Sequence, residues 1–92
     1  MSAQITRTFE IINELGMHAR AATKLVQLAS RFKAEIEIEK DGQRANAKSV
    51  MGVLLLCGAK GSKIIVHARG VDAARAVEDI GQLFADRFGE DR

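Results

Sequence analysis

The spacing of apolar residues changes several times along the first half of the chain, and each change marks a new element. Gln4–Ile12 alternates between apolar and polar positions, which predicts a β-strand. Ala19–Phe32 carries apolar residues at helical spacing, with basic and amide side chains on the opposite stripe. Glu35–Glu39 alternates strictly and predicts a half-buried strand, which the Lys40–Gln43 turn connects to a neighbouring strand over Arg44–Ala47.

A short helix and a last strand follow. Ser49 is a suitable N-cap for a helix that ends near Leu56. The Gly58–Gly61 segment interrupts the pattern, because its two glycines favour a turn over a helix. Beyond it, apolar residues alternate again and predict a strand whose core-facing positions are Ile64, Val66 and Ala68.

A final helix completes the predicted order. Asp72 is expected to cap it, its apolar stripe extends to Phe88, and Gly89 ends it. The order β-α-β-β-α-β-α predicts an α+β fold, because one sheet with helices on a single face buries all of these apolar stripes. No proline or repeat suggests a boundary, so residues 1–92 are expected to form a single domain.

Composition narrows the class of protein. The 47% hydrophobic and 28% charged content is typical of a globular domain. No run of about 18 apolar residues could cross a membrane, and no signal segment opens the chain, so we expect a cytoplasmic protein without membrane insertion. Cys57 is the only cysteine, which excludes an internal disulfide and favours a buried, packed side chain.

Charge is distributed unevenly although the net charge is only +2. The segments Leu15–Ala34 and Gly42–Val71 contain basic residues and no acidic ones. Such asymmetry favours a surface that meets an acidic partner, since complementary fields guide encounter. The alternative is a solvated basic face without a partner.

The strongest chemical signal is His18, which stands where the first helix begins, with Arg20 two residues on. The first turn of a helix offers unpaired backbone N–H groups and a partial positive charge, so it attracts anions. A neutral imidazole has one nitrogen that can act as a nucleophile, and a guanidinium binds phosphoryl oxygens. We therefore predict that His18 accepts a phosphoryl group, held by Arg20 and by the backbone N–H of Ala19. His67 lacks a helix terminus beside it and is expected on the open face of the sheet.

Two segments, Gly16–Arg20 and Lys48–Val53, resemble HPr, the histidine-containing phosphocarrier family of the bacterial phosphoenolpyruvate-dependent phosphotransferase system. The length of the chain, the order of predicted elements and the Ala59–Gly61 turn agree, so the resemblance covers nearly all of the 92 residues. The chain departs from the family at Ala21, where proline usually follows the arginine. Alanine favours a helix, so we expect the helix to form with less rigidity at its first turn.

The resemblance implies an antiparallel four-stranded sheet in the order 1-4-2-3, an open-faced β-sandwich with three helices on one face. It also implies that phosphoenolpyruvate-charged enzyme I transfers a phosphoryl group to Nδ1 of His18, and that sugar-specific or regulatory acceptor proteins remove it. The chain would then be a stoichiometric carrier for the phosphotransferase system, without a cofactor. A paralogue that serves nitrogen or stress regulation would have the same site residues, so the sequence leaves that choice open.

Ser49 matches the position that a regulatory serine kinase phosphorylates in many HPr proteins, and a kinase/phosphorylase is therefore a candidate partner. The helix after Ser49 is too short to bury all of its apolar side chains, which predicts an exposed docking patch near His18. The predicted partner interface consists of Met17, Lys24, Gln27, Val50, Met51 and Leu54. Two isolated histidines without nearby carboxylate or thiol ligands do not predict a metal site.

A nucleic-acid-binding module is the alternative from another class. Gly58–Gly61 satisfies the Gly-x-x-Gly pattern of KH domains, and the isoelectric point is near 9.0. In KH domains that loop joins two helices, whereas here a strand is predicted directly after it. The chain has no tyrosine or tryptophan to stack on bases. No nucleic acid is therefore expected among the partners.

Overall fold

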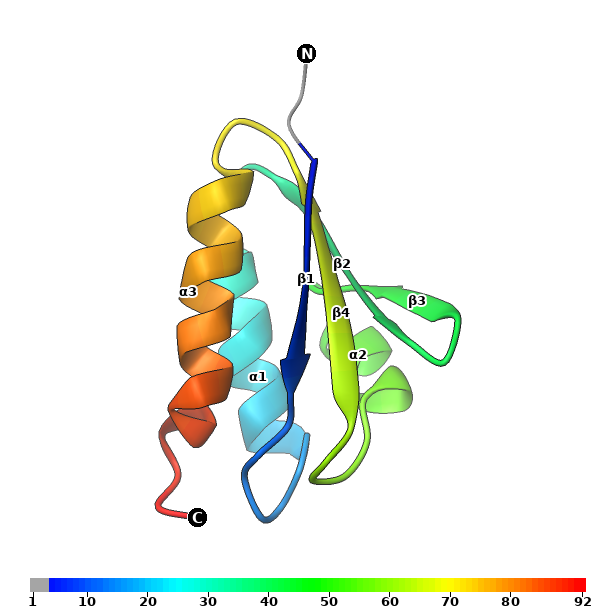
Figure 1. Cartoon of the computed structure of the whole chain (residues 1–92), viewed down its shortest axis with the longest axis vertical. Helices are drawn as coiled ribbons and strands as arrows, with labels where there is room; N and C mark the ends of the chain where they lie inside the picture. Colours follow the sequence, from blue (N-terminus) through cyan, green and yellow to red (C-terminus); the bar gives the residue numbers. More distant parts are fainter. Residues whose placement is uncertain (1–3) are drawn as a thin grey trace.

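The computed structural model describes residues 4–92 and contains one four-stranded antiparallel sheet with helices on one face (Figure 1). Residues 1–3 of the predicted domain lie outside the described part. The order of elements agrees with the prediction. The elements are β1 (Gln4–Glu10), α1 (Ala19–Ala29), β2 (Glu35–Lys40), β3 (Gln43–Asn46), α2 (Val50–Leu56), β4 (Lys63–Arg69), α3 (Ala73–Ala85) and a 3₁₀ turn (Arg87–Gly89).

Strand β4 lies between β1 and β2, and its alternation decides which side chains are buried. Ile64, Val66 and Ala68 point toward the helices and are buried, as predicted. On the other face, His67 lies opposite Thr6 of β1 and Glu37 of β2. The strands follow the order β1-β4-β2-β3, so the prediction of an open-faced sandwich is confirmed.

The core fills the space between the sheet and the helices. Helix α3 packs on β1 and β4, and α1 packs beside α2 and α3; both helices bury a stripe of apolar residues, because their apolar positions recur at helical spacing. Gly81 of α3 leaves room for the ring of Phe9, which would meet a Cβ at 2.7 Å. Cys57 is buried, as predicted, and burial raises the pKa of its thiol to about 11.

β1 and α1 both end earlier than predicted. β1 ends at Glu10 rather than Ile12, where the backbone leaves the ladder to pair with the loop before β4. α1 ends at Ala29 rather than Phe32, because the N–H groups of Arg31 and Phe32 bond to carbonyls three residues back. This tighter turn still packs Phe32 against the core.

The last helix differs most from its prediction. α3 ends at Ala85, and the chain turns through left-handed conformations at Arg87 and Phe88, with φ values of 55° at both. The turn buries the ring of Phe88 completely, at 5.0 Å from the ring centroid of Phe84. The Nζ of Lys24 donates to the Phe88 carbonyl at 2.6 Å. The burial of Phe88 and the hydrogen bond from Lys24 are both tertiary contacts, and they stabilise this turn in place of a longer helix.

Asp72 occupies the N-cap position of α3, but its side chain does not cap that helix as predicted. Its carboxylate accepts instead from the backbone N–H groups of Lys33 at 2.9 Å and Ala34 at 2.8 Å. These bonds join the start of α3 to the connection before β2. The backbone hydrogen bond from Lys33 contributes most to holding the pKa of Asp72 below its ordinary value. Within residues 4–92, no helix has the length and hydropathy needed to cross a membrane.

Candidate functional site

His18 is the N-cap residue of α1, as predicted, with extended backbone angles of φ −83° and ψ 178°. The backbone turns at Gly16, which has a φ of +70°, just before the helix begins. The His18 N–H donates to the Gly16 carbonyl at 3.0 Å. The Met17 N–H donates to the Gly58 carbonyl at 3.0 Å, which ties the segment to the loop after α2. These contacts hold the His18 side chain, which is 27% exposed, at the N-terminus of α1.

The two ring nitrogens of His18 have different partners. Nδ1 accepts a hydrogen bond from the backbone N–H of Arg20 at 3.2 Å. Nε2 faces the side-chain carboxylate of Glu90, which can only accept when it is ionised. These partners assign the proton to Nε2 and the lone pair to Nδ1. The nitrogen that carries the lone pair is thus directed at the N–H groups of the first helical turn.

Glu90 is a site residue that the sequence analysis missed. It reaches His18 across 72 residues of chain, and Asn13 supports it by donating from Nδ2 to the second carboxylate oxygen at 3.0 Å. Asn13 is fully buried, and among the described residues its Oδ1 has no hydrogen-bond partner. A lone glutamate after the final glycine carries no local signal, because its importance depends on where the C-terminal turn places it.

Burial raises the pKa of Glu90, but hydrogen bonds from His18 and Asn13 and the charge of Lys24 lower it by more. The resulting pKa lies below its ordinary value, so the carboxylate is ionised at neutral pH. An ionised carboxylate beside Nε2 agrees with the proton assignment of the imidazole. Charge and tautomer are therefore consistent at this site.

Arg20 lies on the exposed side of α1 and makes no ion pair with any described residue. It borders an open depression of about 380 Å³ next to His18, lined by Glu14, Leu15, Arg20, Glu90, Asp91 and Arg92. The depression is thus lined by three carboxylates and two guanidinium groups, and the Arg20 guanidinium is not engaged in an ion pair with any of the described residues. Lys24, one turn further along α1, is engaged with the Phe88 carbonyl instead.

The predicted interface residues separate into exposed and buried ones. Met51 is 65% exposed, Val50 is 38% exposed, and Gln27 is exposed on the neighbouring α1. Leu54 is partly buried against the core. Met17 is only 6% exposed, so the expectation that its side chain belongs to an exposed patch was wrong. Its backbone N–H donates to the Gly58 carbonyl, and its side chain packs in the core. Leu55 of α2, which was not among the predicted interface residues, is 80% exposed.

Ser49 caps α2, as predicted, and its Oγ accepts from the Gly52 N–H at 3.2 Å. Gly52 faces Ala45 of β3, where an added Cβ would lie 3.3 Å from the alanine methyl. The helix therefore packs closely on the strand, and its exposed side carries the apolar residues named above. Ser49 itself is half-buried at the edge of this surface.

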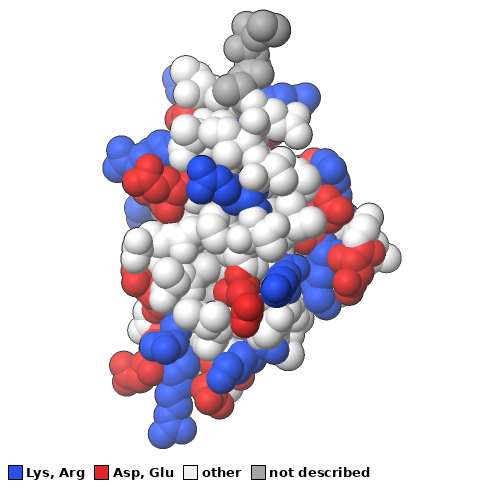
Figure 2. All heavy atoms as spheres, viewed as in Figure 1, with Lys and Arg blue, Asp and Glu red and all other residues white. Residues whose placement is uncertain are grey.

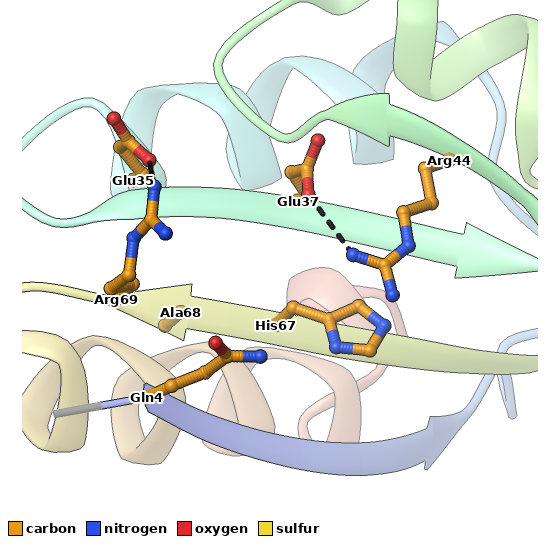
Figure 3. A pocket seen from close by; sticks show the side chains of 7 residues that line it. All are labelled: Gln4, Glu35, Glu37, Arg44, His67, Ala68 and Arg69. Atoms are coloured by element: carbon orange, nitrogen blue, oxygen red, sulfur yellow. Dashed lines mark hydrogen bonds and ion pairs between the residues drawn. The ribbon is translucent and has the colours of Figure 1, made fainter.

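His67 lies on the open face of the sheet, as predicted, but it is enclosed by its neighbours. Its side chain is 13% exposed, Nε2 lies 2.7 Å from Glu39 Oε1, and Nδ1 lies 3.2 Å from Thr6 Oγ1. Figure 3 shows it beside cross-strand ion pairs between Glu37 and Arg44 and between Glu35 and Arg69. Within residues 4–92, no group of three potential metal ligands converges.

Folding partly neutralises the charge asymmetry of the sequence. Figure 2 shows basic and acidic side chains interspersed over the visible face. Lys60 lies 3.6 Å from Glu14, and Arg44 contacts Glu37 and Glu39 at 3.3 Å each. A uniformly basic surface is therefore absent from the face seen in Figure 2.

Comparison with known proteins identifies the class to which this fold and site belong. The family described as "PTS HPr component phosphorylation site" matches residues 5–86. A phosphocarrier protein HPr from Neisseria meningitidis is 43% identical over 86 residues, covering 94% of this chain and 97% of the relative. One from Treponema pallidum is 38% identical over 87 residues, covering 95% and 99%.

Solved structures agree with the sequence relatives. HPr from Thermoanaerobacter tengcongensis superposes with a TM-score of 0.92 at 39% identity, covering 96% of this chain and 99% of that one. HPr from Bacillus anthracis gives 0.83 at 40% identity, covering 87% and 95%. The chain belongs to the HPr family of phosphocarrier proteins of the phosphotransferase system. Gly58–Gly61 joins α2 to β4 and does not join two helices, so the KH-like alternative lacks its structural context.

Proposed function

We propose that His18 accepts a phosphoryl group on Nδ1 from phosphoenolpyruvate-charged enzyme I and passes it to acceptor proteins of the phosphotransferase system. The observation that carries this proposal is the contrast between the two ring nitrogens. Nδ1 carries the lone pair at a helix N-terminus, and Nε2 faces the Glu90 carboxylate. The chain acts as a stoichiometric, cytoplasmic carrier, and its family membership supports that role.

In the transfer, the Nδ1 lone pair forms a bond to phosphorus while the donor's bond to phosphorus breaks. The electron pair of the broken bond returns to the donor. Nε2 keeps its proton during this step, so the ring gains positive charge as the new N–P bond forms. The reverse exchange delivers the group to an acceptor, so the protein binds the phosphoryl group without making it inert.

Three groups of the chain are positioned to bind the phosphoryl oxygens. The backbone N–H groups of Ala19 and Arg20 belong to the first turn of α1, where anions are favoured by the helix dipole. The Arg20 guanidinium adds charge-assisted hydrogen bonds from the exposed side. Phosphoryl transfer depends mainly on positioning and charge stabilisation, which these groups supply.

The docking surface is formed by the adjoining exposed sides of α1 and α2. It contains apolar side chains with a polar border, an arrangement common at transient interfaces. Its members are Gln27, Val50, Met51 and Leu55, with the partly buried Leu54 beneath them. Lys24 lies one turn beyond Arg20 on α1 and is engaged with the C-terminal turn, so it contributes charge rather than a free side chain.

Ser49 is proposed as a regulatory phosphorylation site for a serine kinase/phosphorylase. A phosphate there would lie at the N-terminus of α2, next to the exposed apolar side chains of the docking surface. The added negative charge is compatible with the helix but unfavourable for a partner that buries this surface. Modification of Ser49 would therefore slow phosphoryl exchange at His18 without unfolding the protein.

The test is incubation with phosphoenolpyruvate, magnesium and enzyme I. The parent protein should gain one acid-labile, base-stable phosphoryl group, and His18→Ala should gain none. His67→Gln is the matched control, because it keeps a polar side chain on the open face and should label normally. Labelling retained in His18→Ala would show that another residue is the acceptor.

A further inference from the structure

The C-terminal segment Asp86–Arg92 returns to the end of the molecule where α1 begins (Figure 1). The buried ring of Phe88 anchors it to the core, and Lys24 of α1 holds its carbonyl. At the far end, the Glu14 N–H donates to the Arg92 carbonyl at 3.1 Å. These contacts on both sides of Glu90 fix its backbone next to His18.

The carboxylate of Glu90 is also fixed. One oxygen accepts from Asn13 Nδ2 at 3.0 Å, and the other accepts from His18 Nε2. The side chains of His18 and Glu90 are only 27% and 15% exposed, so solvent screens their interaction less than that of a surface pair. The Asn13 amide also donates to the Gly16 carbonyl at 2.8 Å, which links this carboxylate to the backbone turn before His18.

We infer that Glu90 is a positioning residue for phosphoryl acceptance, an inference that rests on the proposed function of His18. Glu90 holds the Nε2 proton, limits rotation of the ring, and leaves Nδ1 as the nitrogen that reacts. It also faces the positive charge that the ring gains as the N–P bond forms. A carboxylate in this place lowers the energy of the charged state without touching the phosphoryl group.

Two variants remove the charge of Glu90, one with and one without an acceptor for His18 Nε2. Glu90→Gln removes the negative charge and keeps one acceptor oxygen for His18 Nε2, while its NH2 group replaces the oxygen that accepts from Asn13. Glu90→Ala removes both and frees rotation about the χ2 angle of the imidazole, which has no strong intrinsic preference. Glu78→Gln is the control, because it makes the same charge change at an exposed position on α3. Unfolding curves of all variants should match the parent closely enough that each is folded at the assay temperature.

The reaction is measured with phosphoramidate, a small donor that needs no docking, so effects on partner binding do not enter. We expect Glu90→Gln to react about ten-fold more slowly than the parent, with the product still on Nδ1, as loss of a charge-assisted contact implies. Glu90→Ala should be at least as slow and should form some Nε2-phosphohistidine, which phosphorus and nitrogen NMR distinguish. A role in folding alone would not change which nitrogen is phosphorylated.

Glu90→Ala reacting at the parental rate, and only on Nδ1, would overturn the inference. That result leaves the proposed function intact, because the parent and the variant would both be labelled on His18. A parent that phosphoramidate and charged enzyme I both fail to label on His18 would instead refute the proposed function. The ¹⁵N spectrum of unphosphorylated His18 gives a further check, since the parent should show the Nε2–H tautomer.

Discussion

Replacing Gly16 with alanine tests whether the turn before α1 requires a glycine at this position. Gly16 adopts φ +70°, and a Cβ there would lie 2.9 Å from the Ala59 Cα and 2.9 Å from the Gly58 carbonyl oxygen. Both contacts are with backbone atoms, which cannot rotate away. Gly42 is the matched control, since its φ is +82° and a Cβ there would meet nothing within 4 Å.

The two substitutions share one cost and differ in another. A left-handed conformation costs an alanine roughly 1–2 kcal/mol, partly offset by about 0.4–1 kcal/mol from the stiffer unfolded chain. Gly42→Ala should therefore lose about 1 kcal/mol. The backbone overlap at Gly16 adds about 1–3 kcal/mol, as in other overpacked sites. The expected loss for Gly16→Ala is thus about 2–4 kcal/mol, or a melting temperature lowered by about 8 °C or more.

Urea unfolding measures both losses on the same scale. Phosphoryl acceptance measured well below the melting temperature should also fall in Gly16→Ala, because relief of the overlap moves the turn that positions His18. Gly42→Ala should accept phosphate at the parental rate, as its hairpin lies away from the site. Equal stability losses in the two variants would refute the argument, since the clash would then contribute nothing.

Three further substitutions test other parts of the site and fold. Arg20→Ala should change the unfolding free energy by no more than about 0.5 kcal/mol but slow phosphotransfer about ten-fold; normal transfer would exclude Arg20 as the phosphoryl partner. Ser49→Ala should lose about 1 kcal/mol of unfolding free energy, because the helix cap is removed. Ser49→Asp should fold normally but accept phosphate slowly at low salt, and its rate should recover as salt rises. If Ser49→Asp accepts phosphate at the parental rate at low salt, Ser49 has no regulatory role. Asp72→Asn should be less stable than the parent at neutral pH. The pKa of Asp72 is lower in the folded protein than its ordinary value of 3.8, so its ionised carboxylate stabilises the fold at pH values above 3.8. That difference should shrink as the pH falls through the folded-state pKa, and a pH-independent difference would contradict the carboxylate clamp.

Local signals were sufficient for most of the fold. Strict alternation in β2 and β4 places Ile36, Ile38, Ile64 and Val66 in the core, because side chains on a strand point alternately to opposite faces. Ser49 and His18 were expected at or beside the starts of helices, and both are N-caps. The start of a helix can be predicted from sequence, because the capping hydrogen bond joins residues only two or three positions apart.

The strand order 1-4-2-3 followed from the resemblance to HPr and not from periodicity. Alternation shows which face of a strand is buried, but it contains no information about which strand is its neighbour. The ends of α1 and α3 were also placed too late, because apolar residues such as Phe32 and Phe88 continue each stripe beyond the helix. Both side chains still reach the core, but through tighter turns that helical spacing alone cannot distinguish from a longer helix.

The sequence by itself identified the candidate nucleophile His18, its place at the start of a helix and the neighbouring Arg20 guanidinium, because the two residues lie within one turn of chain. The resemblance to HPr implied Nδ1 as the reacting nitrogen, but only the tertiary structure showed the physical reason for that choice of nitrogen. That choice depends on Glu90, 72 residues away, which a left-handed turn and the packing of Phe88 bring to Nε2. Contacts of this separation are made by the folded core, so no local pattern in the chain could reveal them.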